Sequence, residues 1–199
     1  MGKIIWLKSA TSTNAIARQR LADTDNLSVF ATFEQTAGRG QGSHTWYSTP
    51  GKNLTFSIVF KPEALEAKDA LLLTQITTLS LVEYLAAENV EARIKWPNDI
   101  WVQDRKICGI LIENVLDGAF VHDSIIGIGL NLNEENWPEE LPNPVSLKEL
   151  SSKSYDIVQE LERFYKIFCR HAEMIESESG RKYLDKEFSE RVFRLPEVL

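Results

Sequence analysis

Four β-strand signals follow one another between residues 92 and 130, with only turn residues between them. Strands joined by such short connections pair antiparallel, because a parallel pair needs a crossover of a dozen residues or more. This run therefore predicts a sheet built largely from hairpins. The strand signals lie at 92–96, 100–103, 106–116 and 119–130, and the turns lie at Pro97-Asn98-Asp99, Asp104-Arg105 and Asp117-Gly118.

Helical and extended patterns are interspersed in the rest of the chain. Apolar side chains at three- and four-residue spacing predict a long, partly buried helix over residues 66–88. This mixed order predicts an α+β fold, in which a mostly antiparallel mixed sheet is flanked by helices. We further expect strands at 3–8, 28–34 and 54–60, helices at 13–22, 154–176 and 179–190, and an irregular proline-rich segment at 132–150.

Composition excludes several classes of protein. The chain has 199 residues, which is the size of one principal domain, and a net charge of −7, whereas a nucleic-acid-binding surface is normally basic. The sequence contains no run of about 18 apolar residues, so it predicts no membrane span. Its first residues also lack the apolar run of a signal peptide. Cys108 and Cys169 lie far apart without metal-ligand spacing, so we interpret them as free thiols in a reducing cytoplasm.

A glycine-rich segment follows the strand expected at 28–34. Gly38-Arg39-Gly40 would let backbone N–H groups approach a ligand, and Arg39 adds a fixed positive charge, a combination that suits an anion such as phosphate. The segment is neither a P-loop nor a dinucleotide fingerprint. Taken alone, it is more typical of a surface loop that is merely flexible.

Lys95 stands near the end of a predicted strand, directly before the turn at Pro97. With a period of two, Arg93 and Lys95 share one face while Ile94 and Trp96 share the other. A lysine held on a strand is well placed to stabilise charge in a transition state. The alternative is a solvated strand lysine beside a core tryptophan.

Two further side chains are candidates for contact with a flat, polar ring. Asn131 follows glycines 127 and 129 and offers both a donor and an acceptor, which matches a purine edge, and Trp46 could serve as a stacking platform. A strand end packed against a helix and a buried loop anchor are the competing interpretations. The three histidines form no cluster in the sequence, so we expect no metal site built on histidine.

In their order along the chain, these motifs resemble the catalytic core of biotin–protein ligases, also called biotin–[acetyl-CoA-carboxylase] ligases. The resemblance runs from about residue 5 to residue 150, and more loosely to 190. It implies the class II aminoacyl-tRNA synthetase/biotin ligase-like fold. The matching landmarks are Ser12-Thr13-Asn14, Gln35-Thr36-Ala37-Gly38-Arg39-Gly40, Trp46, Lys95-Trp96-Pro97-Asn98-Asp99, Asp104-Arg105-Lys106-Ile107, Gly109-Ile110-Leu111 and Gly127-Ile128-Gly129-Leu130-Asn131.

The resemblance implies a two-step reaction. Biotin would first attack the α-phosphate of ATP, with Mg²⁺ accompanying the nucleotide, and give biotinyl-5′-AMP and pyrophosphate. A lysine of a biotin carboxyl carrier domain would then take the biotin and release AMP. The implied partners are thus ATP, biotin and the carrier domain, with no nucleic acid, no membrane and a possible homodimer. Two alternatives remain open: a lipoate or octanoate ligase-like acyl transferase, and a non-catalytic biotin or biotinyl-AMP binding protein.

The resemblance also implies roles for individual residues. Lys95 and Arg39 would be catalytic, because they neutralise the like charges of carboxylate and polyphosphate. No metal ligand is assigned. The implied nucleotide-binding residues are Gly40, Trp46, Lys95 and Asn131. The implied biotin-binding residues are Ser12, Thr13, Asn14, Gln35, Gly38, Arg39, Gly109 and Leu111.

The sequence departs from the family pattern in three places. Gln41-Gly42-Ser43 replaces loop residues that usually include arginine, which predicts a weaker hold on the adenylate or compensation elsewhere. The motifs begin within the first fifteen residues, so we expect no DNA-binding domain before them. We expect a catalytic domain over residues 1–190, and at 191–199 the start of a missing or truncated C-terminal module.

Overall fold

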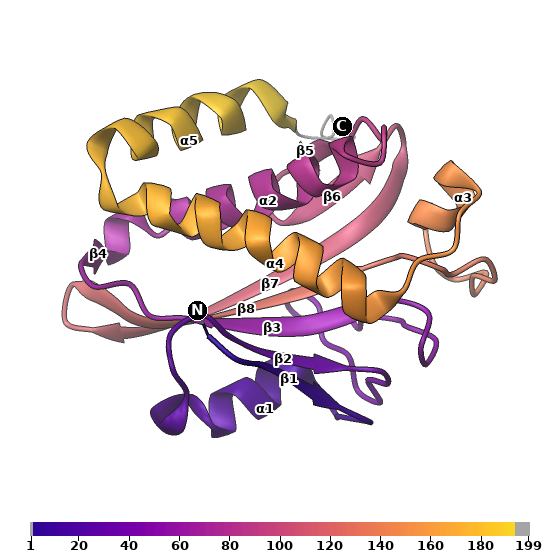
Figure 1. The fold of residues 1–199 in the computed structure, drawn as a ribbon, viewed down its shortest axis with the longest axis horizontal. Coiled ribbons are helices and arrows are strands. Elements are labelled where there is room, and N and C mark those ends of the chain that lie inside the picture. The colour runs from indigo at the N-terminus through magenta and orange to yellow at the C-terminus, as the bar shows by residue number, and fades with distance from the viewer. Residues whose placement is uncertain (1, 194–199) are drawn as a thin grey trace.

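The computed structural model describes residues 2–193, which form one mixed sheet with helices on both faces (Figure 1). The strand order is β1-β2-β3-β8-β7-β6-β5-β9, and β4 pairs with β8 beside this path. Neighbours pair antiparallel except β1 with β2 and β5 with β9, so the predicted fold class is confirmed. The strands are β1 Ile4–Leu7, β2 Ser28–Thr32, β3 Leu54–Phe60, β4 Leu65–Glu66, β5 Arg93–Lys95, β6 Asp99–Val102, β7 Arg105–Asp117, β8 Phe120–Leu130 and β9 Val192–Phe193.

Three long helices, α2, α4 and α5, form a layer over one face of the sheet, and α1 lies on the opposite face against β2, β3 and β8 (Figure 1). The Asp156 carboxylate begins α4 by accepting hydrogen bonds from the N–H groups of Val158 and Gln159 (2.9 and 3.0 Å). The helices are α1 Thr13–Gln19, α2 Leu71–Ala86, α3 Leu147–Ser151, α4 Ile157–Glu173 and α5 Glu178–Arg191, with 3₁₀ turns at Leu21–Asp23, Ala67–Asp69 and Met174–Glu176.

The differences from the predicted elements lie mainly at their ends. The helix expected from residue 66 begins at Leu71, because Leu65–Glu66 pair with Val121 and Phe120 as strand β4. The helix expected over 13–22 is α1 followed by a separate 3₁₀ turn. The segment 132–150 is not wholly irregular: Ser146 caps the short helix α3 in a capping box with Glu149.

Alternation along the strands divides the core between the two faces. Ile126 and Ile128 of β8 pack with the main helical layer, whereas Ile125 packs with Ala17 of α1 on the other face. Gly127 and Gly129 share the face of Ile125, which α1 covers only in part. The rest of that face is where a cavity forms.

The last described strand joins the far edge of the sheet. Val192–Phe193 pair in parallel with Ile94 and Lys95 of β5, and the Trp96 N–H donates to the Phe193 carbonyl (2.9 Å). We expected a second module to start in the segment 191–199, but Val192 and Phe193 belong to the sheet. Residues 194–199 lie outside the described part of the chain. Within residues 2–193, no helix has the length and apolar character that crossing a membrane requires.

Candidate active site

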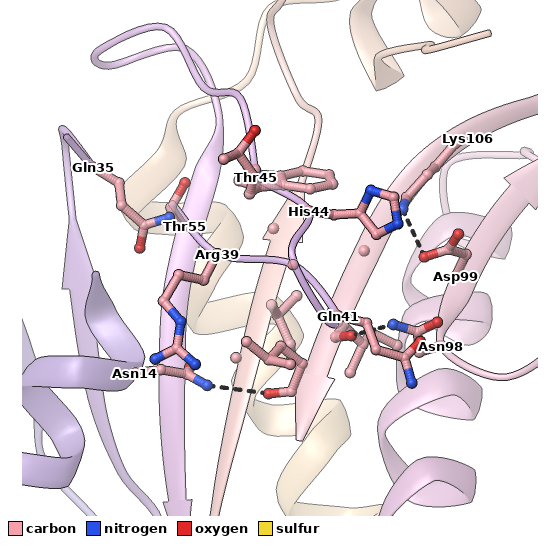
Figure 2. Close-up of a pocket in the computed structure, with 18 of the residues that line it drawn as sticks. Asn14, Gln35, Arg39, Gln41, His44, Thr45, Thr55, Asn98, Asp99 and Lys106 are labelled. Atoms are coloured by element: carbon pink, nitrogen blue, oxygen red, sulfur yellow. Dashed lines mark hydrogen bonds and ion pairs between the residues drawn. The ribbon is translucent and has the colours of Figure 1, made fainter. Parts of the chain in front are cut away.

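A cavity of about 580 Å³ opens on the α1 side of the sheet. Its floor comes from β5, β6, β7 and β8, one wall from the start of α1, and its roof from the loop of residues 35–46 (Figure 2). That volume lies within the range of small-ligand sites. The site residues predicted from sequence that line it are Ser12, Thr13, Asn14, Gln35, Arg39, Gly40, Trp46, Lys95, Gly109 and Leu111.

A network of buried hydrogen bonds organises the end of the cavity at α1. The Gln35 side-chain oxygen accepts from the Thr13 N–H (2.9 Å), one of the helix N-terminal donors that lack an intrahelical partner. Ser57 Oγ of β3 lies 2.7 Å from Thr13 Oγ1 and 2.6 Å from Asn14 Oδ1. Ser12, with 5% of its surface exposed, completes this polar wall. Its donors and acceptors are thus fixed before any ligand arrives.

Asn14 connects α1 to the floor of the cavity. Its Nδ2 donates to Glu113 Oε2 (2.8 Å) and to the Leu111 carbonyl (3.3 Å), and a side chain at residue 127 would overlap its Oδ1. Glycine at 127 is therefore required by close approach. Asn14 holds α1 and β7 at a fixed distance.

Arg39 reaches from the roof to the same end of the cavity (Figure 2). Its guanidinium lies 3.4 Å from Glu113 Oε1, and Arg18 of α1 approaches the same oxygen at 3.5 Å. The Arg39 side chain is 55% exposed, so this pair is screened and contributes little stability. The guanidinium can therefore exchange Glu113 for an anionic ligand at small cost.

Trp46 ends the loop, and its side-chain ring lies on the floor at the other end of the cavity. A methyl group at Gly109 would come within 2.7 Å of the Trp46 ring, and one at Gly129 would overlap the ring. These two glycines face each other across β7 and β8 and leave a flat bed for the indole. The buried Trp46 Nε1 has no hydrogen-bond partner among the described residues.

Lys95 meets its neighbours on the adjacent strands. Its ammonium lies 4.2 Å from the centroid of the Trp101 ring, and Asp99 is its cross-strand partner. Asp99 in turn forms an ion pair of 2.7 Å with Lys106 at the start of β7. Lys106 also stands 5.6 Å from the centroid of the Trp46 ring. Sequence analysis assigned no role to Trp101 or Lys106, although both line the cavity.

Two predicted site residues, Gly38 and Asn131, are not among the described residues that line the cavity. Gly38 instead accepts from the Trp46 N–H at the base of the loop (3.0 Å). Asn131 is 3% exposed, and its Nδ2 donates to the Val145 carbonyl (3.1 Å), away from the cavity. Its Oδ1 has no partner in the described structure.

Cysteines and metal ligands are further possible sources of chemistry in the described part of the chain. Burial raises the pKa of the Cys108 thiol, and both cysteines are buried and free, so Cys108 is held as an unreactive thiol. Among the described residues, no group of three histidine, cysteine, aspartate or glutamate side chains could hold a metal ion.

The fold and the cavity describe an α+β domain with a site of small-ligand size, and comparison of the sequence identifies its family. Residues 6–131 match the model of the biotin/lipoate A/B protein ligase family, and the chain belongs to this family.

Individual relatives narrow the similarity to the biotin branch. The chain is 32% identical over 149 residues to the bifunctional ligase/repressor BirA of Bacillus spizizenii. The matched region covers 69% of this chain and 46% of BirA. It is 34% identical over 129 residues to the biotin–[acetyl-CoA-carboxylase] ligase of Paracoccus denitrificans, covering 63% of this chain and 53% of that enzyme. The chain thus spans about half the length of these relatives.

Solved structures agree on the fold. Biotin protein ligase from Aquifex aeolicus in complex with biotin and ATP superposes with a TM-score of 0.82 and 26% identity, over 97% of this chain and 79% of that one. Biotin protein ligase from Leishmania major in complex with biotin has a TM-score of 0.80 at 24% identity, over 99% and 85% of the two chains, which supports the fold alone.

Proposed function

We propose that this chain carries the catalytic site of an ATP-dependent ligase that activates biotin as biotinyl-5′-AMP and transfers the biotin to a lysine of a biotin carboxyl carrier domain. The observation that supports this most is that Arg39 and Lys95 line one cavity, between a polar wall at α1 and the Trp46 ring. That arrangement suits the junction of a carboxylate with a polyphosphate, where like charges must be neutralised.

In the first step, a carboxylate oxygen of biotin forms a bond to the α-phosphorus of ATP, and the bond from that phosphorus to pyrophosphate breaks. Arg39 and Lys95 would stabilise the charge that gathers on the phosphoryl oxygens. The wall of Ser12, Thr13, Asn14 and Gln35 would bind the polar head of biotin, with Gly109 and Leu111 beneath it.

In the second step, the amine of the carrier lysine attacks the carbonyl carbon of the mixed anhydride, AMP leaves, and the amine loses a proton. The mixed anhydride must be kept from water between the steps. Gly40 and the rest of the loop roof the cavity, so the loop is the element that would provide this protection.

Trp46 is the predicted nucleotide-binding residue that would contact the base. The Trp46 ring would stack on the adenine from its glycine bed. Asn131 does not line the cavity and its Nδ2 is engaged with Val145, so the structure gives no support to its predicted contact with the base. Gly38 would act by fixing the base of the loop.

Mg²⁺ would enter as part of the nucleotide substrate. This ion is commonly held by one or two carboxylates together with substrate phosphates. Asp99 supplies a carboxylate within the cavity, although it is paired with Lys106. The residues present therefore fit an ion that the phosphates carry in, and such an ion would supply further neutralisation of charge.

The carrier domain remains a proposed partner, supported by the similarity to ligases of this class. A cytoplasmic location is supported by the two free cysteines. The possible homodimer stays a prediction, which sedimentation at several protein concentrations would check.

The proposal is tested by incubating the protein with biotin, ATP, Mg²⁺ and a purified carrier domain. Pyrophosphate release followed by biotin on the carrier lysine is the expected result. Transfer of lipoate or octanoate in preference to biotin would favour the other branch of the family. Tight biotin binding without pyrophosphate release would indicate a non-catalytic binding protein.

A further inference from the structure

The face of β3 that turns toward α1 changes in character along the strand. Thr55 lines the cavity, whereas Val59 packs with Ala17 of α1 in the apolar contact beyond it. Ser57 stands between these two positions on the same face, with 0% of its surface exposed, and is not among the described residues that line the cavity. Burial of a hydroxyl is costly unless it is hydrogen-bonded. The hydrogen bonds of Ser57 therefore have to offset that cost.

The orientation of the Asn14 amide determines where the Ser57 proton goes. The amide nitrogen of Asn14 lies against two groups that only accept, the Glu113 carboxylate (2.8 Å) and the Leu111 carbonyl (3.3 Å). The amide oxygen therefore faces Ser57, whose Oγ lies 2.6 Å away. Since an amide oxygen has no proton, Ser57 donates in this contact.

The hydroxyl protons of Ser57 and Thr13 are both used within the wall. Ser57 Oγ lies 2.7 Å from Thr13 Oγ1, and Thr13 Oγ1 lies 3.4 Å from Gln35 Oε1. With the contact to Asn14, two protons serve three contacts between oxygen atoms. Turning the Thr13 proton toward a ligand would leave two of these contacts without a proton. Thr13, which lines the cavity, therefore presents a lone pair to a ligand.

We infer that Ser57 is a positioning residue that makes this wall an acceptor of hydrogen bonds, and that it thereby selects a ligand whose head carries N–H donors. The inference rests on the proposed function, in which that head is the cyclic urea of biotin. The dithiolane ring of lipoate and the alkyl chain of octanoate carry no N–H, so an accepting wall gives them no hydrogen bond. Ser57 acts through Thr13 and Asn14 and contacts no ligand itself.

Calorimetry of ligand binding to the wild type and to Ser57→Ala would test the inference. The variant should bind biotin roughly three- to tenfold more weakly, which corresponds to one neutral hydrogen bond, because Thr13 is then free to turn its proton toward the ligand. Desthiobiotin keeps the urea and lacks the sulfur, so its affinity should fall by the same factor. Unchanged biotin affinity would overturn the inference.

The KM for ATP separates a positioning role from general damage to the fold. ATP is expected at the end of the cavity with the Trp46 ring, so its KM in pyrophosphate release should be the same for Ser57→Ala and the wild type. An increase in the KM for ATP as large as the loss of biotin affinity would overturn the inference.

Ser124 offers a matched control on the neighbouring strand β8. It is as fully buried as Ser57 and pairs with Phe60 of β3, but its Oγ has no hydrogen-bond partner among the described residues. Ser124→Ala should therefore leave biotin affinity at the wild-type value. A loss as large as that of Ser57→Ala would mean that any small change inside the sheet weakens biotin binding, and would overturn the inference.

A double-mutant cycle with Thr13→Val tests whether Ser57 acts through the Thr13 hydroxyl. Valine keeps the shape of threonine without its hydroxyl, so Ser57→Ala should cost much less biotin affinity in that background. An equal loss in both backgrounds would overturn the inference.

Should Ser57→Ala fail to fold, Ser57→Cys takes its place, because a thiol is a weaker donor than a hydroxyl. Biotin binding by that variant as tight as in the wild type would overturn the inference. Failure of the wild type to bind biotin at all would instead refute the proposed function.

Discussion

The ammonium of Lys95 lies 4.2 Å from the centroid of the Trp101 ring, so the candidate catalytic cation rests on an indole of the neighbouring strand. An ammonium over an aromatic face is stabilised and restricted in position. Trp101 is therefore a positioning residue for Lys95, although it comes from a different strand and carries no charge.

Replacement of Trp101 by leucine should slow adenylate formation roughly two- to thirtyfold, which corresponds to the ~0.5–2 kcal/mol of a cation–π contact. Trp101→Phe should recover most of the rate, because it keeps an aromatic face. Pyrophosphate release gives the measurement. Trp137→Leu is a suitable control, since Trp137 donates to Glu149 away from the cavity. Equal rates for the leucine and phenylalanine variants at residue 101 would contradict the assignment.

Replacement of Lys95 by alanine should lower the rate of adenylate formation by about 10²-fold or more, as loss of a transition-state donor does. The fold should persist, because the Lys95 side chain is only partly buried. Pyrophosphate release and biotin binding would be measured together, and biotin should still bind at the wall of α1. Near-normal turnover by this variant would show that our role for Lys95 is wrong.

The glycine bed beneath Trp46 makes a prediction about coupling. Gly129→Ala should destabilise the protein by roughly 1–3 kcal/mol, because the new methyl group overlaps the indole. In a Trp46→Ala background, the same change should cost much less. Urea unfolding of the four proteins gives the coupling free energy, and an equal cost in both backgrounds would mean that the ring does not lie on Gly129.

Gln41 is expected to limit the hold on the reaction intermediate. Gln41→Arg adds a cation to a residue that lines the cavity, so biotinyl-5′-AMP should dissociate roughly tenfold more slowly or slower still. Release of labelled adenylate from the wild type and the variant would measure this. An unchanged dissociation rate would contradict this role of residue 41.

His171 makes stability depend on pH. Burial lowers its pKa below the ordinary value of 6.5, despite Glu83 nearby, and its Nδ1 is hydrogen-bonded to Ser80 (2.8 Å). The unfolded chain therefore binds a proton more readily than the folded one. Stability should fall as the pH drops below about 6.5 and level off below the folded-state pKa. His171→Gln should remove this increment from thermal unfolding profiles; identical profiles would contradict it.

Periodicity predicted much of the fold because the strands are long or clearly bounded. Arg93 and Lys95 do share the face opposite Ile94, as a period of two requires. β4 and β9 are two residues long, which is too short for a pattern, and their pairing depends on partners distant in sequence. The parallel pairs β1–β2 and β5–β9 at the two edges were also not predicted, because each joins segments that are distant in sequence.

Most of the predicted site residues line the cavity, because their motifs lie at the start of α1, in the loop of residues 35–46 and on the strands of the floor. Asn131 differs because it lies just beyond the end of β8, where alternation no longer sets direction, and the Ile107 carbonyl and residue 145 turn it away. The pair of Asp99 and Lys106 depends on a register shift at residues 100 and 101, which the sequence does not reveal. An unshifted hairpin that pairs residue 99 with residue 109 would instead place Lys106 on the face opposite Asp99.

The parallel pairing of β9 with β5 has a practical consequence for handling this protein. Neighbouring strands lie about 5 Å apart, so anything fused after Phe193 would be tethered beside the strand that bears Lys95. An affinity tag there risks interfering with turnover, and a reporter there would sense it. β1 forms the opposite margin of the sheet, which makes the N-terminal side the safer attachment point.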